Sequence, residues 1–151
     1  MAKNKREIDL KVKQEELEST AARLFLTLGY DGTSMSRIAR ELGVAPNTLY
    51  WYYPSKDELL VAVLNRQMSA TLARLPGIAG LPLKDKMAWA LQAFEQSREL
   101  VTTVHARLEQ SAVIREWHEQ FHHFVEAAVI HTLEAEGVAP ARAAMLATVG
   151  T

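Results

Sequence analysis

The sequence predicts an all-α protein in which a helix-turn-helix precedes a larger helical part. Apolar residues recur at intervals of three and four through most of the 151 residues, as one face of an α-helix requires. Gly43 ends one such pattern and Pro46 can begin the next, so a tight corner joins two short helices. A hydrophobic content of 48% is enough to bury a core, in one domain or two small ones.

The first helix is predicted over residues 14–28, where Leu17, Ala21 and Leu24 lie on one apolar stripe. Gly29 can end it. Residues 1–13 form a basic arm, which we expect to be a solvated, disordered tail in preference to an extension that touches DNA. The basic residues of this arm are Lys3, Lys5, Arg6, Lys11 and Lys13.

The next two helices are predicted over residues 35–42 and 46–53. Thr33 or Ser34 can cap the earlier one, and the free amides at that helix start could also hold a phosphate. The later helix has only two turns, so it cannot bury all of its apolar and aromatic residues. Its wheel places Leu49 and Tyr53 on one side, while Asn47, Thr48 and Trp51 point away from it. Outward Asn, Thr and Tyr suit a DNA major groove; the alternative is that the aromatic rings pack on neighbouring helices.

A fourth helix should open with a capping box formed by Ser55 and Glu58 and continue to about Leu75. Lys56 is unexpected there, because a cation in the first turn opposes the helix dipole. An external anion would explain it, although an exposed lysine without a partner would be harmless.

The remaining helices are predicted over residues 83–96, 99–109, 112–136 and 140–149, with a loop at 76–82. In the first of these helices, Leu83, Met87, Leu91 and Phe94 share an apolar stripe. The last helix is rich in alanine and uncharged in its later part.

Four blocks of residues connect this chain with a known family. They are GYDGTSMSRIA at residues 29–39, LGV at 42–44, TLYWYY at 48–53 and SKDEL at 55–59. In order and spacing they resemble the amino-terminal signature of the tetracycline repressor (TetR) family of transcriptional regulators. The resemblance covers roughly residues 14–66.

The resemblance implies a cytoplasmic, all-helical homodimer that binds double-stranded DNA at an inverted-repeat operator and is released by a small-molecule effector. It implies a DNA-binding domain at residues 1–56 and a regulatory domain at 57–151, incomplete at its carboxy terminus. In that family the carboxy-terminal helices usually continue and form the dimer interface, so the resemblance implies either a truncated sequence or an unusually short member, and half of a dimer interface at 143–149. The base-reading positions of the family fall on Ser36, Pro46, Asn47 and Tyr50, and its phosphate contacts fall on Ser34, Thr48, Tyr52 and Lys56.

A ligand pocket among the later helices should be mostly apolar with a few polar anchors. The candidate lining residues are Trp89, Phe94, His105, Trp117, Phe121 and His131. For His131, a hydrogen-bonded core histidine is the alternative.

The segment from His118 to His122 fits the pattern H-E-x-x-H of zinc peptidases. Glu134 and Glu136 could only serve as further ligands from about three turns along the same predicted helix, some ~18 Å away, which is too far to close a tetrahedral site. Because this third ligand is missing, we expect no metal, no cofactor and no catalytic activity. A zinc peptidase is kept only as an alternative function.

Composition limits the other classes. The chain has no cysteine, which excludes a disulfide scaffold and thiolate metal sites. The start of the chain does not resemble a signal peptide, and the longest aliphatic run, at residues 59–64, is too short to cross a bilayer. A net charge of −1 lacks the usual basic footprint of a nucleic-acid binder, so a helical protein-interaction module is a further alternative.

Overall fold

A computed structural model of the chain describes the backbone of residues 2–148 and the side-chain surroundings of residues 10–147. The described residues form helices and contain no strand, as predicted. The helices are α1 (Ala2–Leu28), α2 (Met35–Glu41), α3 (Pro46–Tyr52), α4 (Lys56–Leu72), α5 (Leu75–Ile78), α6 (Leu83–Gln96), α7 (Arg98–Arg107), α8 (Ala112–Ala135) and α9 (Pro140–Thr148).

The predicted helix starts are confirmed by their hydrogen bonds. The Ser34 hydroxyl accepts from the backbone amide of Arg37 at 3.1 Å and so caps α2. Ser55 does the same for the amide of Glu58, which confirms one half of the capping box at α4. The other half is not formed: one carboxylate oxygen of Glu58 is buried without a hydrogen-bond partner among the described residues.

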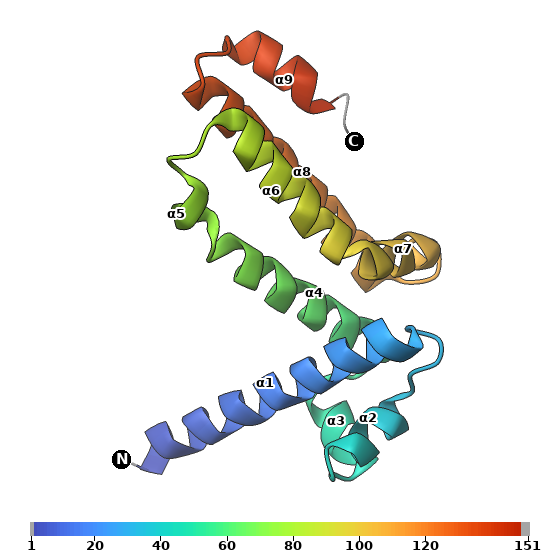
Figure 1. Cartoon of the computed structure of the whole chain (residues 1–151). Coiled ribbons are helices and arrows are strands. Elements are labelled where there is room, and N and C mark those ends of the chain that lie inside the picture. Colours follow the sequence, from blue (N-terminus) through green and yellow to red (C-terminus); the bar gives the residue numbers. More distant parts are fainter. Residues whose placement is uncertain (1, 149–151) are drawn as a thin grey trace.

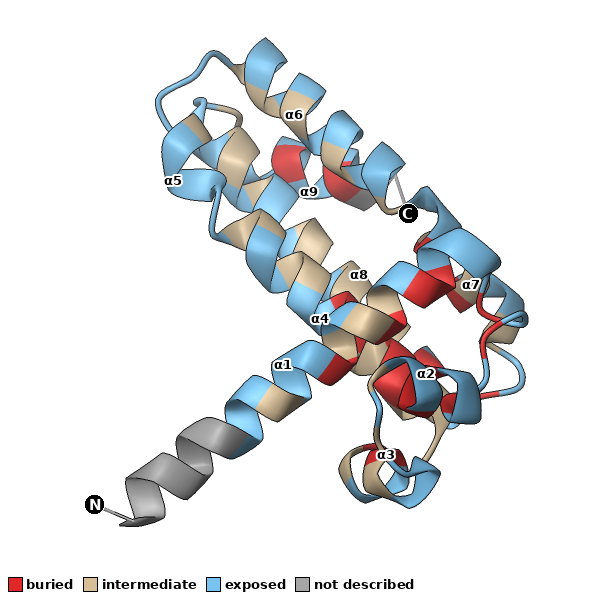
Figure 2. Ribbon diagram, turned by 60° about the horizontal axis from the view of Figure 1, so that its bottom comes forward, coloured by how far each residue is buried: buried red, intermediate tan, exposed pale blue. Residues whose placement is uncertain are grey.

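Helices α1 to α4, α7 and α8 contribute to one principal cluster of buried apolar residues. Figure 2 marks the buried residues of the chain in red. The cluster joins Leu17 and Leu24 of α1 with Ile38 of α2, and it continues into Leu60 of α4 and Ile114 of α8. Residues before and after position 56 therefore share a core. The division into domains 1–56 and 57–151 stays a prediction.

Figure 1 shows where this core places the short helices α2 and α3. They project together at one end of the molecule, and α9 lies on α8 at the other end. The long helix α4 connects these two parts. In the described part of the chain, no helix has both the length and the apolar character needed to cross a bilayer.

The structure corrects three predictions. The backbone of the basic arm is helical and not a disordered tail, because α1 already begins at Ala2. The side chains of residues 1–9 lie outside the described residues. The predicted loop at 76–82 starts with the last residues of α5.

The third correction concerns α6, whose predicted apolar stripe faces outward. Met87, Leu91 and Phe94 are exposed, whereas Lys86 and Trp89 lie on the half-buried side. Lys86 also pairs with Glu136 at 2.8 Å. The helical wheel correctly groups the apolar residues, but a wheel does not show which side of the helix its neighbours cover.

Candidate DNA-binding surface and its junction with the helical domain

The corner between α2 and α3 depends on Gly43. Its φ of 67° lies in the left-handed region, which side chains with a Cβ rarely adopt. The amide of Val44 donates to the Ala39 carbonyl at 3.0 Å, and the Gly43 amide donates to Arg40 at 3.2 Å. This pair of bonds closes the end of α2, and Pro46 then occupies the start of α3.

The outward side of α3 carries the predicted base-reading residues. Pro46, Asn47 and Tyr50 are exposed, and Ser36 on α2 is exposed as well. Trp51, which the site prediction omits, is 71% exposed and is the most exposed large apolar residue of those described. The helical wheel of α3 places Trp51 on the outward side, and this position is the signal in the sequence that could have added Trp51 to the predicted site. Its ring meets the edge of Tyr52 at a centroid distance of 4.8 Å.

The opposite side of α3 is held by Leu49 and Tyr53, both buried. The Tyr53 hydroxyl donates to Glu18 at 2.5 Å and accepts from Gln14 at 2.9 Å, which ties the end of α3 to α1. Burial and the hydrogen bond to Glu18 raise the pKa of Tyr53 to about 12. The neutral hydroxyl is therefore the form that supports α3.

The predicted phosphate contacts divide into two kinds. Ser34 is exposed, while Thr48 and Tyr52 are half-buried at the edge of the surface. Lys56 is different, because its ammonium group donates to the backbone carbonyls of Tyr30 at 2.8 Å and Thr33 at 2.9 Å. Two of its three N–H donors are thus used inside the protein, and the ammonium group also lies 3.9 Å from the centroid of the Tyr30 ring. Burial and the nearby Arg107 charge lower the pKa of Lys56.

Beside Lys56, a cluster connects the helix-turn-helix with α7. The Arg107 guanidinium pairs with both carboxylate oxygens of Asp57, and the Tyr30 hydroxyl donates to the same carboxylate. Arg107 also lies over the Tyr30 ring at 4.8 Å. Burial acts to raise the pKa of Asp57, but hydrogen bonds from Arg107 and Tyr30 hold it below its usual value. No local pattern points to Arg107, because its partner Asp57 lies 50 residues away in the chain.

Of the predicted pocket residues, only His105 lines either of two open depressions in the described part of the chain. Trp117 stacks on Phe121 with ring centroids 5.1 Å apart, and its indole N–H donates to Asn65 at 2.8 Å. Phe94 and His131 are exposed, and Trp89 is half-buried on α6. For His131, the alternative of a core histidine is wrong in the structure.

His105 instead meets two histidines of the H-E-x-x-H segment. Its Nε2 lies 3.2 Å from Nε2 of His118, which is 3.0 Å from Nε2 of His122. Burial, together with the neighbouring charges that His122 and His105 would carry, lowers the pKa of His118. Glu119 and Glu126 help to line an open depression of about 400 Å³ at this cluster.

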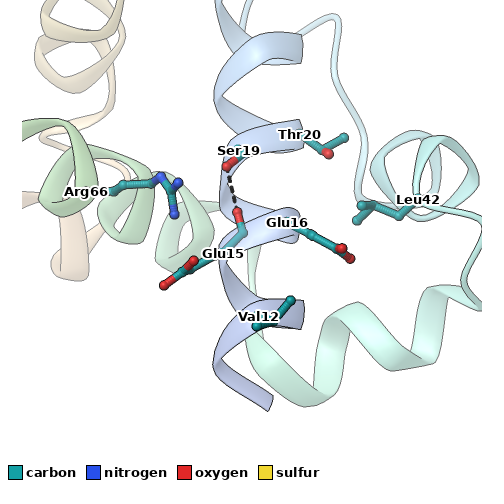
Figure 3. Close-up of a pocket in the computed structure, with 7 residues that line it drawn as sticks. All are labelled: Val12, Glu15, Glu16, Ser19, Thr20, Leu42 and Arg66. Carbon is teal, nitrogen blue, oxygen red and sulfur yellow. Dashed lines mark hydrogen bonds between the residues drawn. The ribbon is translucent and has the colours of Figure 1, made fainter. Parts of the chain in front are cut away.

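A second open depression, of about 420 Å³, lies beside α1 (Figure 3). Arg66 of α4 reaches toward it, and the Ser19 hydroxyl is engaged with the Glu15 carbonyl at 2.7 Å. Its lining includes none of the predicted pocket residues.

Sequence comparison identifies the amino-terminal part. Residues 18–63 match the family described as bacterial regulatory proteins, tetR family. The uncharacterised HTH-type transcriptional regulator YuxN of Bacillus subtilis (strain 168) is 36% identical over 69 residues, which is 46% of this chain and 24% of that protein. An HTH-type transcriptional regulator of Staphylococcus aureus (strain USA300) is 37% identical over 60 residues, 40% of this chain and 32% of that protein. The similarity thus spans about a quarter to a third of these relatives.

Solved structures share the fold over most of the chain. A transcriptional regulator from Rhodococcus sp. Rha1 has a TM-score of 0.74 at 19% identity, covering 90% of this chain and 76% of that one. A TetR transcriptional regulator from Legionella pneumophila has a TM-score of 0.68 at 19% identity, with 89% and 78% covered. A candidate transcriptional regulator from Saccharomonospora viridis, in complex with choline, has a TM-score of 0.69 at 20% identity, with 91% and 79% covered.

Proposed function

Because this chain belongs to the tetR family of bacterial regulatory proteins, we propose that it binds double-stranded DNA through α3 and the start of α2. The observation that carries this proposal is the two-sided build of α3. Leu49 and Tyr53 fix one side in the core, and the other side presents Asn47 and Tyr50 to solvent. A rigid helix with amide and hydroxyl groups outward suits the base edges of a major groove.

In this proposal, Ser36, Pro46, Asn47 and Tyr50 contact bases. Ser34, Thr48, Tyr52 and the remaining donor of Lys56 contact phosphates, which fix the register of the helix on the duplex.

We further propose that the protein is a cytoplasmic repressor without catalytic activity, released from DNA by a small molecule bound among the later helices. The Arg107–Asp57 pair supports such coupling, since it connects α7 directly with the first turn of α4 beside Lys56. The S. viridis protein of the same fold was solved with choline, a small molecule. Among the predicted pocket residues, Trp117 and Phe121 stack on each other and could offer an aromatic surface to such a molecule.

The proposed operator is an inverted repeat bound by a homodimer, with half-sites about one helical turn, ~34 Å, apart. Ala143 and Ala147 are buried, so this side of α9 is already used within the chain. The exposed Phe124 of α8 and Leu146 of α9 are left as candidates for the dimer contact, while residue 149 of the predicted interface lies outside the described residues. Light scattering of a chain that continues past Thr151 should give twice the mass of one chain, whereas these 151 residues should dimerise more weakly or not at all. A monomeric mass for the longer chain would contradict the dimer.

Selection of duplexes from a random pool tests the DNA proposal. The purified protein should enrich a shared inverted repeat. Enrichment of no common sequence would contradict sequence-specific binding and favour the interaction module.

A further inference from the structure

Three histidine side chains meet between α7 and α8. His118 and His122 stand one turn apart on the same face of α8. His105 comes from α7, which lies at the start of α8 (Figure 1). One nitrogen from each of the three rings lies within 4.8 Å of the other two. A third ligand for the H-E-x-x-H pair is therefore present, and it comes from α7, not from the helix that carries Glu134.

Hydrogen bonds alone do not satisfy this arrangement. Nε2 of His118 has two imidazole nitrogens near it, at 3.2 Å from His105 and 3.0 Å from His122. A neutral ring nitrogen carries either one hydrogen or one lone pair, so it makes only one good bond of this kind. A cation between the rings would let each nitrogen direct its lone pair to the same centre.

The spacing of the nitrogens fits such a cation. Zinc–nitrogen bonds of ~2.0–2.1 Å in a tetrahedron hold the ligand nitrogens about 3.3 Å apart. The observed separations of 3.2 Å and 3.0 Å are close to this value. The third pair, His105 and His122, lies within 4.8 Å, so these two nitrogens would have to approach by up to about 1.5 Å to complete the set.

Both helices are anchored next to the cluster. On α7, Val104 precedes His105 and is buried. Arg107 follows about half a turn later, and its guanidinium is hydrogen-bonded to Asp57. On α8, Ile114 is buried and Trp117 is bonded to Asn65. The rings are thus presented by a supported scaffold, and the open depression beside them leaves space for a water or another fourth ligand.

We propose that His105, His118 and His122 bind one divalent transition-metal ion of the zinc class, which joins α7 to α8. Imidazole is a preferred ligand of zinc, copper and nickel, whereas magnesium and calcium prefer oxygen. The site stands apart from DNA binding, and it does not depend on the function proposed above.

Bound metal is not by itself a peptidase. Glu119 lines the same depression, as the peptidase pattern requires. However, the described residues include no strand edge along which an extended peptide could be aligned. We therefore assign the ion a structural role, in which it links α7 to α8, and not a catalytic role.

Titration of the tag-free, metal-free protein with Co²⁺ tests the proposal. The expected result is visible absorption typical of tetrahedral cobalt, complete at one ion per chain, which Zn²⁺ then displaces. His105→Ala and His118→Ala should each weaken Zn²⁺ binding by at least about tenfold, the range found even for residues that only support a ligand. His131→Ala is the matched control, because this histidine lies on α8 outside the cluster.

The decisive comparison is between His105→Ala and wild type. An unchanged affinity would show that His118 and His122 act only as a surface pair, and would overturn the three-histidine site. Equal weakening by His131→Ala, or the absence of tetrahedral cobalt absorption, would overturn it too. His105→Gln provides a second variant, and far-ultraviolet circular dichroism checks that each variant is folded.

Discussion

The guanidinium of Arg107 binds the carboxylate of Asp57 through two parallel contacts. Nε lies 2.7 Å from Oδ1, and Nη2 lies 3.0 Å from Oδ2. Charge-assisted pairs with this geometry are among the stronger hydrogen-bonded contacts in proteins. Here the pair links α7 with the first turn of α4, at the point where the helix-turn-helix meets the later helices.

Arg107→Ala should lower the free energy of unfolding by about 1–3 kcal/mol. This value lies between an exposed pair, worth under ~1 kcal/mol, and a buried pair, whose disruption costs ~3–5 kcal/mol. The side chains of Arg107 and Asp57 are 23% and 17% exposed, which supports the intermediate value. Urea unfolding monitored by circular dichroism measures it.

Arg98→Ala is the control for that variant. Arg98 is also on α7, but its contact with Glu95 at 3.5 Å is largely exposed. Its loss should cost less than about 0.5 kcal/mol. Equal costs for the two variants would mean that the Arg107–Asp57 pair does not stabilise the junction.

Tyr53→Phe should destabilise the protein by about 1–2 kcal/mol near neutral pH, because it removes hydrogen bonds with Glu18 and Gln14. The pKa of Tyr53 is raised to about 12, so its contribution is complete below the unfolded value of ~10 and is lost as the pH rises toward 12. The difference in stability between wild type and Tyr53→Phe should therefore shrink above pH ~10. Tyr50→Phe, at an exposed position, is the control. A difference that stays constant across this range would contradict the assignment.

Lys56→Ala should weaken binding to all duplexes alike and reduce the slope of log affinity against log salt by about one unit. The same variant should also lower stability, since it leaves the carbonyls of Tyr30 and Thr33 without their donor. Lys84→Ala, at an exposed position on α6, should change neither quantity. A lower stability with an unchanged salt slope would show that Lys56 only holds the turn together.

Asn47→Ala should relax base preference at one position of the operator by ~1–3 kcal/mol, the value of a bidentate pair with adenine. Affinity for non-specific DNA should not change. Binding to a panel of single-base operator variants measures this. An equal loss on every sequence would make Asn47 a positioning residue.

Local chemistry made much of the helix-turn-helix predictable from sequence. The left-handed turn at Gly43, the cap at Ser34 and the proline that starts α3 are each set by residues within a few positions. The same holds for Leu49 and Tyr53 as the buried side of α3. These features require no knowledge of distant parts of the chain.

Contacts between distant residues were not predictable in this way. An external anion would explain Lys56 at a helix start, and the structure adds two internal partners that the sequence does not indicate, the carbonyls of Tyr30 and Thr33 between α1 and α2. Met87 and Leu91 share a stripe as predicted, yet the packing leaves that stripe outward. His105 joins His118 only because α7 and α8 pack together, which no spacing within one helix reveals.

The ratio of affinities for the selected duplex and for a scrambled duplex tests the central claim most directly. Fluorescence anisotropy at one fixed, physiological salt concentration gives both values with the same protein sample. A sequence-specific regulator should prefer the selected duplex by at least about 10³-fold. Equal affinity for the two duplexes would contradict the account.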